Sequence, residues 1–224
     1  MMTTRSPQLQ VGLLAALTVF ATWLPIQAAD MSIVERWMAT NSGVRSVKIN
    51  FTQTRSMKSI KVPARQSGTL YMDYGRNRFR WEAGVPTQTI VIKQGSGMTI
   101  LRPIGKRYER RAYGSGSVAP GMSALAGGFP RSMSEFNRKY RVISTEKKHN
   151  TYRIETQPLG SAGRGVSRFT FVVQSSGYRL LGVEITLQDG SFINTVFNRV
   201  DLNAAMPASL FAPDLSGYTE TKFD

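Results

Sequence analysis

The sequence predicts a mainly β protein, namely an incomplete (unclosed) antiparallel β-barrel or half-barrel with a few short helices forming a lid. Short segments in which apolar and polar residues alternate follow one another through most of the chain. Tight-turn sequences such as Asp189-Gly190 join them, which favours antiparallel neighbours. Helical patterns are few and short. A sheet of this kind must therefore curve to hide one face, and the helices must cover its open mouth.

The N-terminal segment predicts a secretory signal peptide over residues 1–28. An apolar run from Val11 to Leu24 follows Arg5, and Ala28 supplies the small residue that a cleavage site needs. A membrane anchor is the alternative, but a span needs roughly 20 apolar residues and this run is shorter. We therefore expect residues 29–224 to be an exported, soluble chain that forms a single domain.

The predicted helices begin at two capping boxes. In the first, Ser32 is followed three residues later by Glu35, and the helix should run to about Thr40. The second pairs Ser132 with Glu135 in the same way. The first helix carries apolar residues at helical spacing and the second carries one large apolar residue, so the apolar face of the first must cover another part of the protein. These residues are Ile33, Val34, Trp37 and Met38 in the first helix and Phe136 in the second.

The predicted strands show the two-residue period of a half-buried sheet. In the first, Val47, Ile49 and Phe51 alternate with polar residues. The next two surround the turn at Tyr74-Gly75. In chain order the strand segments are 47–52, 70–73, 78–81, 89–92, 98–101, 152–155, 168–173, 181–187 and 191–200. A glycine- and serine-rich stretch between Gly114 and Lys139 interrupts this pattern, with Met122, Leu125 and Phe129 as its large apolar residues.

The composition argues against several kinds of chemistry. The chain has one histidine and no cysteine, which excludes disulfides, thiolate metal sites and cysteine nucleophiles and disfavours a zinc site. The histidine, His149, lies in a Lys-Lys-His-Asn sequence that is typical of an exposed hairpin turn. The acidic residues are scattered, so no carboxylate pair for acid–base catalysis is indicated. We expect neither enzymatic activity nor a cofactor.

The charge is strongly positive, with a formal net charge of +15 that is spread along the chain. This distribution suits a broadly positive surface that attracts acidic partners or anionic lipid headgroups. A nucleic-acid-binding arm would concentrate the charge, and an exported protein rarely meets nucleic acid. For any single cluster of basic residues, solubility is the better explanation.

Five short motifs occur in a fixed order over residues 32–218. After the first helix come Phe51-Thr52-Gln53, Gly68-Thr-Leu-Tyr71, Phe79-Arg80-Trp81, Leu210-Phe211-Ala-Pro213 and Gly217-Tyr218. This succession resembles the outer-membrane lipoprotein carrier family, LolA. The resemblance implies an unclosed barrel with a helical lid, located in the periplasm. It implies that lipoproteins are accepted from an inner-membrane ABC transporter, shielded at their acyl chains and passed to an outer-membrane receptor by a monomer, without covalent chemistry.

The resemblance also implies roles for individual residues. Phe79 and Trp81 match the strand that lines the family's acyl-chain cavity. The family commonly has an Arg-Pro pair before that strand, whose arginine holds the lid closed, whereas this chain has Arg76 and Arg78 without a proline. The expected set is Phe51, Leu70, Met72, Phe79, Trp81 and Ile92 in the cavity, Trp37, Met122 and Leu125 in the lid, and Arg76 or Arg78 as the latch.

Other interpretations remain open at this point. Alternation predicts a buried face but does not distinguish packing against side chains from packing against lipid. The same fold could bind a different amphiphile or sense mislocalised lipoproteins. A basic nucleic-acid-binding or enzymatic protein is a third class, and salt-dependent DNA binding would identify its nucleic-acid-binding member.

Overall fold

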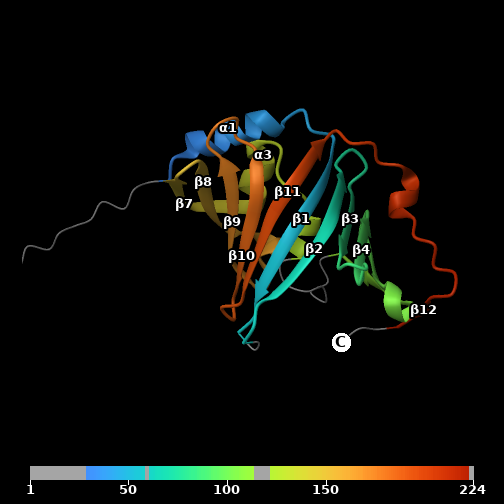
Figure 1. The fold of residues 1–224 in the computed structure, drawn as a ribbon. Helices are drawn as coiled ribbons and strands as arrows, with labels where there is room; N and C mark the ends of the chain where they lie inside the picture. Colours follow the sequence, from blue (N-terminus) through green and yellow to red (C-terminus); the bar gives the residue numbers. More distant parts are fainter. Residues whose placement is uncertain (1–28, 59–60, 114–121, 222–224) are drawn as a thin grey trace, which may run out of the picture.

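One curved sheet of twelve strands organises the molecule, with three short helices against it (Figure 1). This computed structural model describes residues 29–58, 61–113 and 122–221. The predicted signal peptide and part of the glycine-rich stretch, residues 114–121, lie outside the described residues. The strands are β1 (Ser46–Ser56), β2 (Ala64–Asp73), β3 (Arg78–Ala83), β4 (Thr89–Gln94), β5 (Gly97–Arg102), β6 (Arg107–Ala112), β7 (Tyr140–Lys148), β8 (Thr151–Pro158), β9 (Val166–Gln174), β10 (Leu180–Leu187), β11 (Phe192–Leu202) and β12 (Thr219–Glu220).

The strand order confirms the predicted unclosed antiparallel sheet. It runs β12-β6-β5-β4-β3-β2-β1-β11-β10-β9-β8-β7, so the two halves of the chain meet where β1 pairs with β11. In the described residues, β12 and β7 form the two ends of the sheet and do not pair with each other. The short β12 pairs in parallel with β6, which departs from the all-antiparallel prediction.

The helices are α1 (Met31–Asn41), α2 (Met122–Ala126) and α3 (Met133–Lys139). The first predicted cap is wrong, because Asp30 and not Ser32 precedes α1 and its carboxylate accepts from the Ser32 amide at 3.0 Å. The second is confirmed, since the Ser132 hydroxyl accepts from the Glu135 amide at 3.2 Å. No helix among the described residues is long and apolar enough to cross a membrane.

The concave face of the sheet carries the main hydrophobic core. Every second side chain of a strand points to this face, and most of those side chains are apolar. The helices α1 and α3 cover the part of the face formed by β7–β9 (Figure 1). Trp37 of α1 lies 6.2 Å from the Phe136 ring of α3 and 4.7 Å from the Phe171 ring of β9, as measured between ring centroids. This end of the half-barrel is therefore filled by interlocking aromatic rings.

A second, smaller core lies on the opposite face of β3–β6. There the C-terminal segment crosses the outside of the strands, and Phe211 is buried beside Ile92, Leu101 and Tyr108 (Figure 1). The prediction that Ile92 faces the cavity is therefore wrong. Its cross-strand partner is Arg80, whereas Val91 is the residue opposite Trp81. Because side chains alternate between faces, Ile92 must point away from Trp81.

Two substantial strands were not predicted. They are β6, with the sequence RYERRA, and β7, with the sequence YRVISTEKK. Their apolar residues are outnumbered by polar and charged ones, which hides the two-residue period. The predicted turn at His149 is confirmed, because it joins β7 to β8 and has a positive φ of 52°.

The aromatic core predicts an alkaline weakness of the fold. Burial raises the pKa of the Tyr140 phenol well above its ordinary value, and the nearby Tyr113 adds to the shift. The folded state therefore keeps this proton at a pH where the unfolded chain has lost it. The contribution is complete below the unfolded pKa, about 10, and declines above it by about 1.4 kcal/mol per pH unit.

We therefore expect Tyr140→Phe to flatten the alkaline loss of stability. Urea unfolding measured from pH 9 to 11.5 should give a free energy that falls less steeply for the variant, by about 1.4 kcal/mol per pH unit above pH 10. The two proteins should differ little at pH 7, because the ring contacts to Phe169 and Phe171 remain. Parallel pH profiles for the two proteins would contradict this account.

Candidate functional site

The candidate site is the concave face of β1, β2 and β3. Phe51 of β1 stacks on Trp81 of β3, with ring centroids 5.7 Å apart and an interplanar angle of 15°. The stack spans β2 because the intervening residue is Gly68, which pairs with both Phe51 and Ala83. A Cβ atom at Gly68 would lie 2.6 Å from the Phe51 ring and 2.0 Å from the Glu82 carbonyl oxygen. The glycine therefore makes the aromatic stack possible.

The other predicted lining residues extend this surface. Met72 is paired with Phe79, and Leu70 with Trp81, so all four lie on the same face. Trp81 is 3% exposed and Phe79 is 2% exposed. All belong to the continuous cluster that includes the helices. The face is therefore apolar and closed to solvent by other parts of the chain.

The segment around α2 supplies that cover over β2 and β3. Met122 and Leu125, both predicted in the lid, are buried in the main core together with Ala126 and Phe129. Phe129 lies 5.6 Å from Phe197 of β11. Since α2 has only five residues, it depends on these tertiary contacts for stability. We call residues 122–131 the α2 segment.

Trp37 occupies a different place from the other two predicted lid residues. It belongs to α1 and is wedged between Phe136 and Phe171, over the β7–β9 end of the sheet. The α2 segment, in contrast, crosses the β1–β3 side. A Cβ atom on Gly128 would lie 3.3 Å from the Tyr74 ring and 3.9 Å from the Met72 sulfur.

The two candidate latch arginines both lie at Asp73. Arg76 is 71% exposed with its guanidinium 3.5 Å from the carboxylate, and Arg78 is 2.5 Å from it. The Arg78 guanidinium also lies 4.3 Å from the centroid of the Phe211 ring, in the outer core. Neither arginine makes a hydrogen bond to the α2 segment among the described residues.

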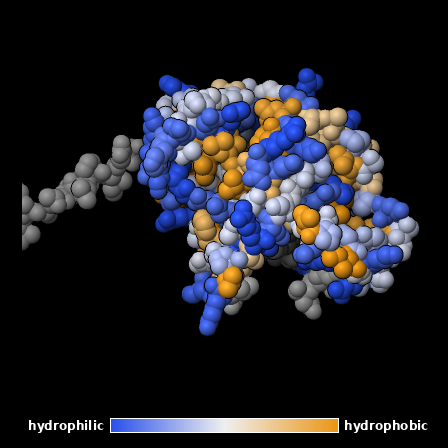
Figure 2. All heavy atoms as spheres, viewed as in Figure 1, coloured by the Kyte–Doolittle hydropathy of each residue, from blue (hydrophilic) through white to orange (hydrophobic). Residues whose placement is uncertain are grey.

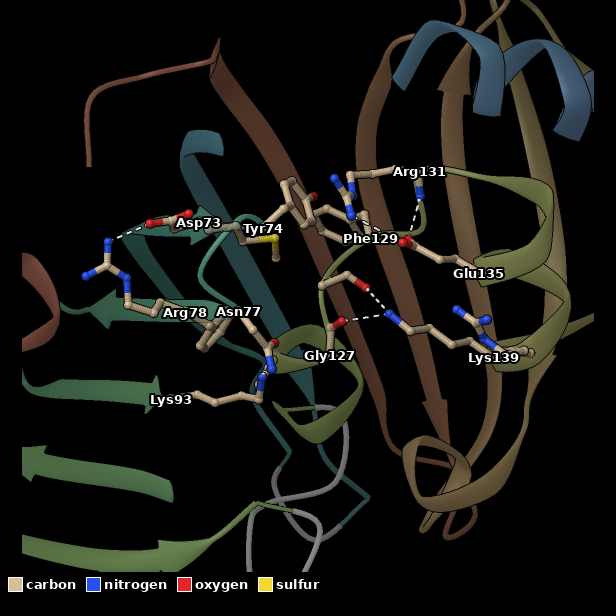
Figure 3. Close-up of a pocket in the computed structure, with 15 residues that line it drawn as sticks. Asp73, Tyr74, Asn77, Arg78, Lys93, Gly127, Phe129, Arg131, Glu135 and Lys139 are labelled. Carbon is tan, nitrogen blue, oxygen red and sulfur yellow. Dashed lines mark hydrogen bonds and ion pairs between the residues drawn. The ribbon is translucent and has the colours of Figure 1, made fainter. Parts of the chain in front are cut away.

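Two basic residues that the sequence did not single out hold the α2 segment instead. The Lys139 amine donates to the carbonyl oxygens of Gly127 at 2.7 Å and Gly128 at 3.4 Å (Figure 3). The Arg131 guanidinium lies 4.7 Å from the Tyr74 ring centroid, pairs with Glu135 at 3.2 Å and donates to the Val44 carbonyl at 3.4 Å. Both connect the α2 segment to fixed elements.

A cavity of about 290 Å³ opens beside this cover. It lies between the end of α1, the residues Phe129–Arg131 and the strands β1, β10 and β11. Its walls are largely apolar, whereas Arg131, Arg179 and Arg199 stand among its lining residues. Figure 2 shows apolar residues interrupting an otherwise charged surface near α1. Ligand pockets usually measure about 300–1,000 Å³, so this cavity alone is small.

Buried polar side chains limit the apolar face at the far end of β1. Gln53, the last residue of the Phe-Thr-Gln motif, donates to the Thr195 hydroxyl at 3.0 Å and accepts from Arg55 at 2.7 Å and from Gln66 at 2.9 Å. Burial lowers the pKa of the Arg55 guanidinium. Because every group in this network is hydrogen-bonded, it forms a stable polar boundary to the apolar surface.

A second cavity of about 210 Å³ lies between β2–β4, the α2 segment and α3 (Figure 3). The buried Lys93 of β4 and Lys139 of α3 both line it. Desolvation lowers the pKa of both amines, and the charge of Lys139 adds to the shift at Lys93. Within the described part of the chain, no group of three or more His, Cys, Asp or Glu residues could hold a metal ion.

Comparison with known proteins identifies the relationship. The family model described as "Outer membrane lipoprotein carrier protein LolA" matches residues 42–214. No curated protein matches the chain. Among solved structures, an uncharacterised conserved protein from Thermus thermophilus matches with a TM-score of 0.52 and 6% identity, covering 85% of this chain and 97% of that one.

Two further solved structures are similar at lower scores. A LolA superfamily protein from Nitrosomonas europaea has 12% identity and a TM-score of 0.46, covering 82% of this chain and 97% of that one. The Mycobacterium tuberculosis lipoprotein LppX has 11% identity and a TM-score of 0.44, covering 80% and 97%. Because the family model spans most of the chain and the fold is the predicted half-barrel, the chain belongs to the LolA family of outer membrane lipoprotein carrier proteins.

Proposed function

We propose that the protein is a periplasmic carrier that binds the acyl chains of lipoproteins on the concave face of its half-barrel. In this role it takes them from an inner-membrane ABC transporter and delivers them to an outer-membrane receptor. The observation that carries the proposal is the apolar face of β1–β3 beneath the cover formed by the α2 segment, whose helix has only five residues. Membership of the LolA family supports the same role.

The α2 segment occupies the space that an acyl chain would take. Exposing the side chains of Met122, Leu125 and Phe129 costs about 1.5–3 kcal/mol each. Removing one long acyl chain from water gains on the order of 10 kcal/mol, at roughly 0.8 kcal/mol per methylene. The two terms are of similar size, so exchanging the α2 segment for an acyl chain leaves only a modest net affinity. A carrier that must release its cargo needs this balance.

The small cavity beside Phe129 offers a place for the exchange to begin. Its apolar walls adjoin the α2 segment, so the end of an acyl chain can enter there before the cover moves. The arginines that line it, Arg131, Arg179 and Arg199, favour acidic groups near the point of entry.

A carrier for a different amphiphile is the second candidate function. The cavity lined by the buried Lys93 and the half-buried Lys139 favours it, because a lipoprotein's acylated end brings no anionic headgroup of its own to pair with these two amines. Both candidates use the same apolar face.

Native mass spectrometry distinguishes the two candidates. The mature protein would be purified from the periplasm of its own host and analysed intact, with a parallel lipid extract. We expect a one-to-one complex with an acylated protein. Small amphiphiles without any lipoprotein would favour the second candidate. A protein that takes up neither offered lipoprotein nor lipid would refute both.

A further inference from the structure

We propose that the cavity between β4 and α3 is a binding site for a phosphate-type anion, presented by the headgroup of an anionic lipid or as free phosphate. The amines of Lys93 and Lys139 would be its principal ligands. Figure 3 shows the two side chains reaching toward the α2 segment from the two sides of this cavity.

The charges around the cavity do not balance. Its lining contains Lys93, Arg131, Arg138 and Lys139 against Glu135, besides the Arg78–Asp73 ion pair, whose guanidinium points to the outer core. Both acids are already engaged, because Asp73 pairs with Arg76 and Arg78, and Glu135 pairs with Arg131. Among the described residues, Lys93, Arg138 and Lys139 thus form no ion pair. An anion would supply the missing charge.

The two amines retain hydrogen-bonding capacity. Lys93 is 4% exposed, donates to the Asn77 side-chain oxygen at 2.7 Å and lies 4.8 Å from the Tyr113 ring centroid. Lys139 donates to the carbonyls of Gly127 and Gly128. An ammonium group has three donors, so each amine keeps at least one that no described residue accepts. Phosphate oxygens are strong acceptors for such donors.

Burial makes the pair costly without a ligand. A charged amine removed from water requires a compensating opposite charge, and here two like charges share one cavity. The lowered pKa of both amines has this origin, with desolvation as the largest cause in each case. Lys93 interrupts an apolar face, because its cross-strand neighbours there are Phe79 and Met98. A ligand role accounts for the charge.

The cavity also has an apolar wall. Met72, Phe79, Ala126 and Phe129 line it, and all four belong to the main hydrophobic core. A bound lipid can therefore place its phosphate at the lysines and its acyl chain along β2 and β3. This lipid form of the inference rests on the proposed acyl-binding function, whereas the binding of free phosphate does not.

Three probes separate the sources of the anion. Isothermal titration would use inorganic phosphate, dihexanoyl phosphatidic acid and dihexanoyl glycerol, the last two having the same tails but differing in the phosphate. We expect phosphatidic acid to bind at least about tenfold more tightly than the glyceride, which corresponds to one charge-assisted hydrogen bond. Lys93→Met should abolish this difference, and Lys148→Met, on the exposed end of β7, should preserve it. Should Lys93→Met fail to fold, Lys139→Gln provides the same comparison.

Each result has a distinct meaning. Equal binding of the two lipids, without phosphate binding, would overturn the anion site and leave the acyl proposal intact. Phosphate binding that depends on Lys93, without binding of either lipid, would support a free-phosphate site and refute the acyl proposal. No binding of any probe would refute both.

Discussion

Phe79→Glu is expected to weaken acyl-chain binding strongly while leaving the sheet folded. Phe79 lies at the centre of the proposed binding face, between Met72 on β2 and Lys93 on β4. A carboxylate in this position would normally destabilise a core. Here the carboxylate would lie opposite Lys93 on the neighbouring strand, so the two side chains can form an ion pair. The positive charge of Lys93 would then be neutralised. The variant thus alters the chemistry of the face with little effect on its fold.

The expected loss of affinity is on the order of 100-fold. Removing a buried phenyl ring forfeits about 1.5–3 kcal/mol of apolar contact, and an acyl chain must then lie against a charged pair. The measurement is the equilibrium dissociation constant for a neutral acylated peptide labelled with a fluorophore. A neutral probe matters because the new carboxylate also cancels the charge of the proposed anion site.

Two control variants test the reasoning. Phe79→Leu keeps the face apolar and should retain affinity within about tenfold, since it loses only part of one side chain. Adding Lys93→Met to Phe79→Glu leaves the carboxylate without its partner and should destabilise the fold by about 3–5 kcal/mol. If Phe79→Glu binds the acylated peptide as well as the unaltered protein does, β3 does not line the acyl site.

The fold was largely predictable because its strands follow a simple period. Val47, Ile49 and Phe51 alternate with polar residues, and all three face the core in β1. The same rule identified the strand that contains Phe79 and Trp81. It missed β6, whose sequence RYERRA is dominated by charged residues. The β-propensity of a residue is a poor predictor in such a strand, because contacts with neighbouring strands decide which side chains fit.

Misassignments within the predicted site have one cause, the lack of a fixed register. In an apolar run such as Ile90-Val91-Ile92, the sequence does not identify which residues face inward. The pairing of β4 with β3 shows that Val91 faces inward, because Val91 lies opposite Trp81. A shift by one residue transfers a side chain to the other face. The same alternation turns Arg78 toward Phe211 and away from the concave face.

The contacts of the α2 segment could not be predicted, because they join residues far apart in the sequence. Arg131 donates to the carbonyl of Val44, 87 residues earlier, and its guanidinium packs on Tyr74. In the sequence it is one of 29 lysines and arginines with no distinguishing local pattern. Lys93 and Lys139 lie 46 positions apart in the chain, and only the folded structure places both of them on the lining of one cavity.

In the folded chain, several of the short motifs contact one another. Arg80, between Phe79 and Trp81, faces outward and donates to the Leu210 carbonyl at 2.8 Å. Strand β3 thereby holds the C-terminal motif on the outer face of the sheet through Arg80, while Phe79 and Trp81 of the same strand form part of the concave face. Gly68 provides the equivalent connection on the inner face, because the Phe51 ring lies over it.

Gly68→Ala is accordingly expected to be the most damaging single-methyl change in the sheet. Its Cβ would lie 2.0 Å from the backbone oxygen of Glu82 and 2.6 Å from the end of the Phe51 ring. The ring can rotate away, but the backbone oxygen belongs to the β2–β3 ladder and cannot. Relief requires these strands to separate, so we expect a loss of about 3 kcal/mol in the free energy of unfolding. Urea unfolding at neutral pH measures it.

Gly97→Ala is the matched control, because Gly97 also lies in a strand but its nearest non-neighbouring heavy atom would be 3.6 Å from the new Cβ. That variant should stay within about 1 kcal/mol of the unaltered protein. Combining Gly68→Ala with Phe51→Leu separates the two clashes, since a smaller side chain at position 51 relieves only the ring contact. Partial recovery of stability would assign the remainder to the Glu82 carbonyl. If Gly68→Ala were as stable as Gly97→Ala, β2 and β3 would not be as tightly fixed as this structure requires, and the Phe51–Trp81 stack could not be the rigid floor of an acyl site.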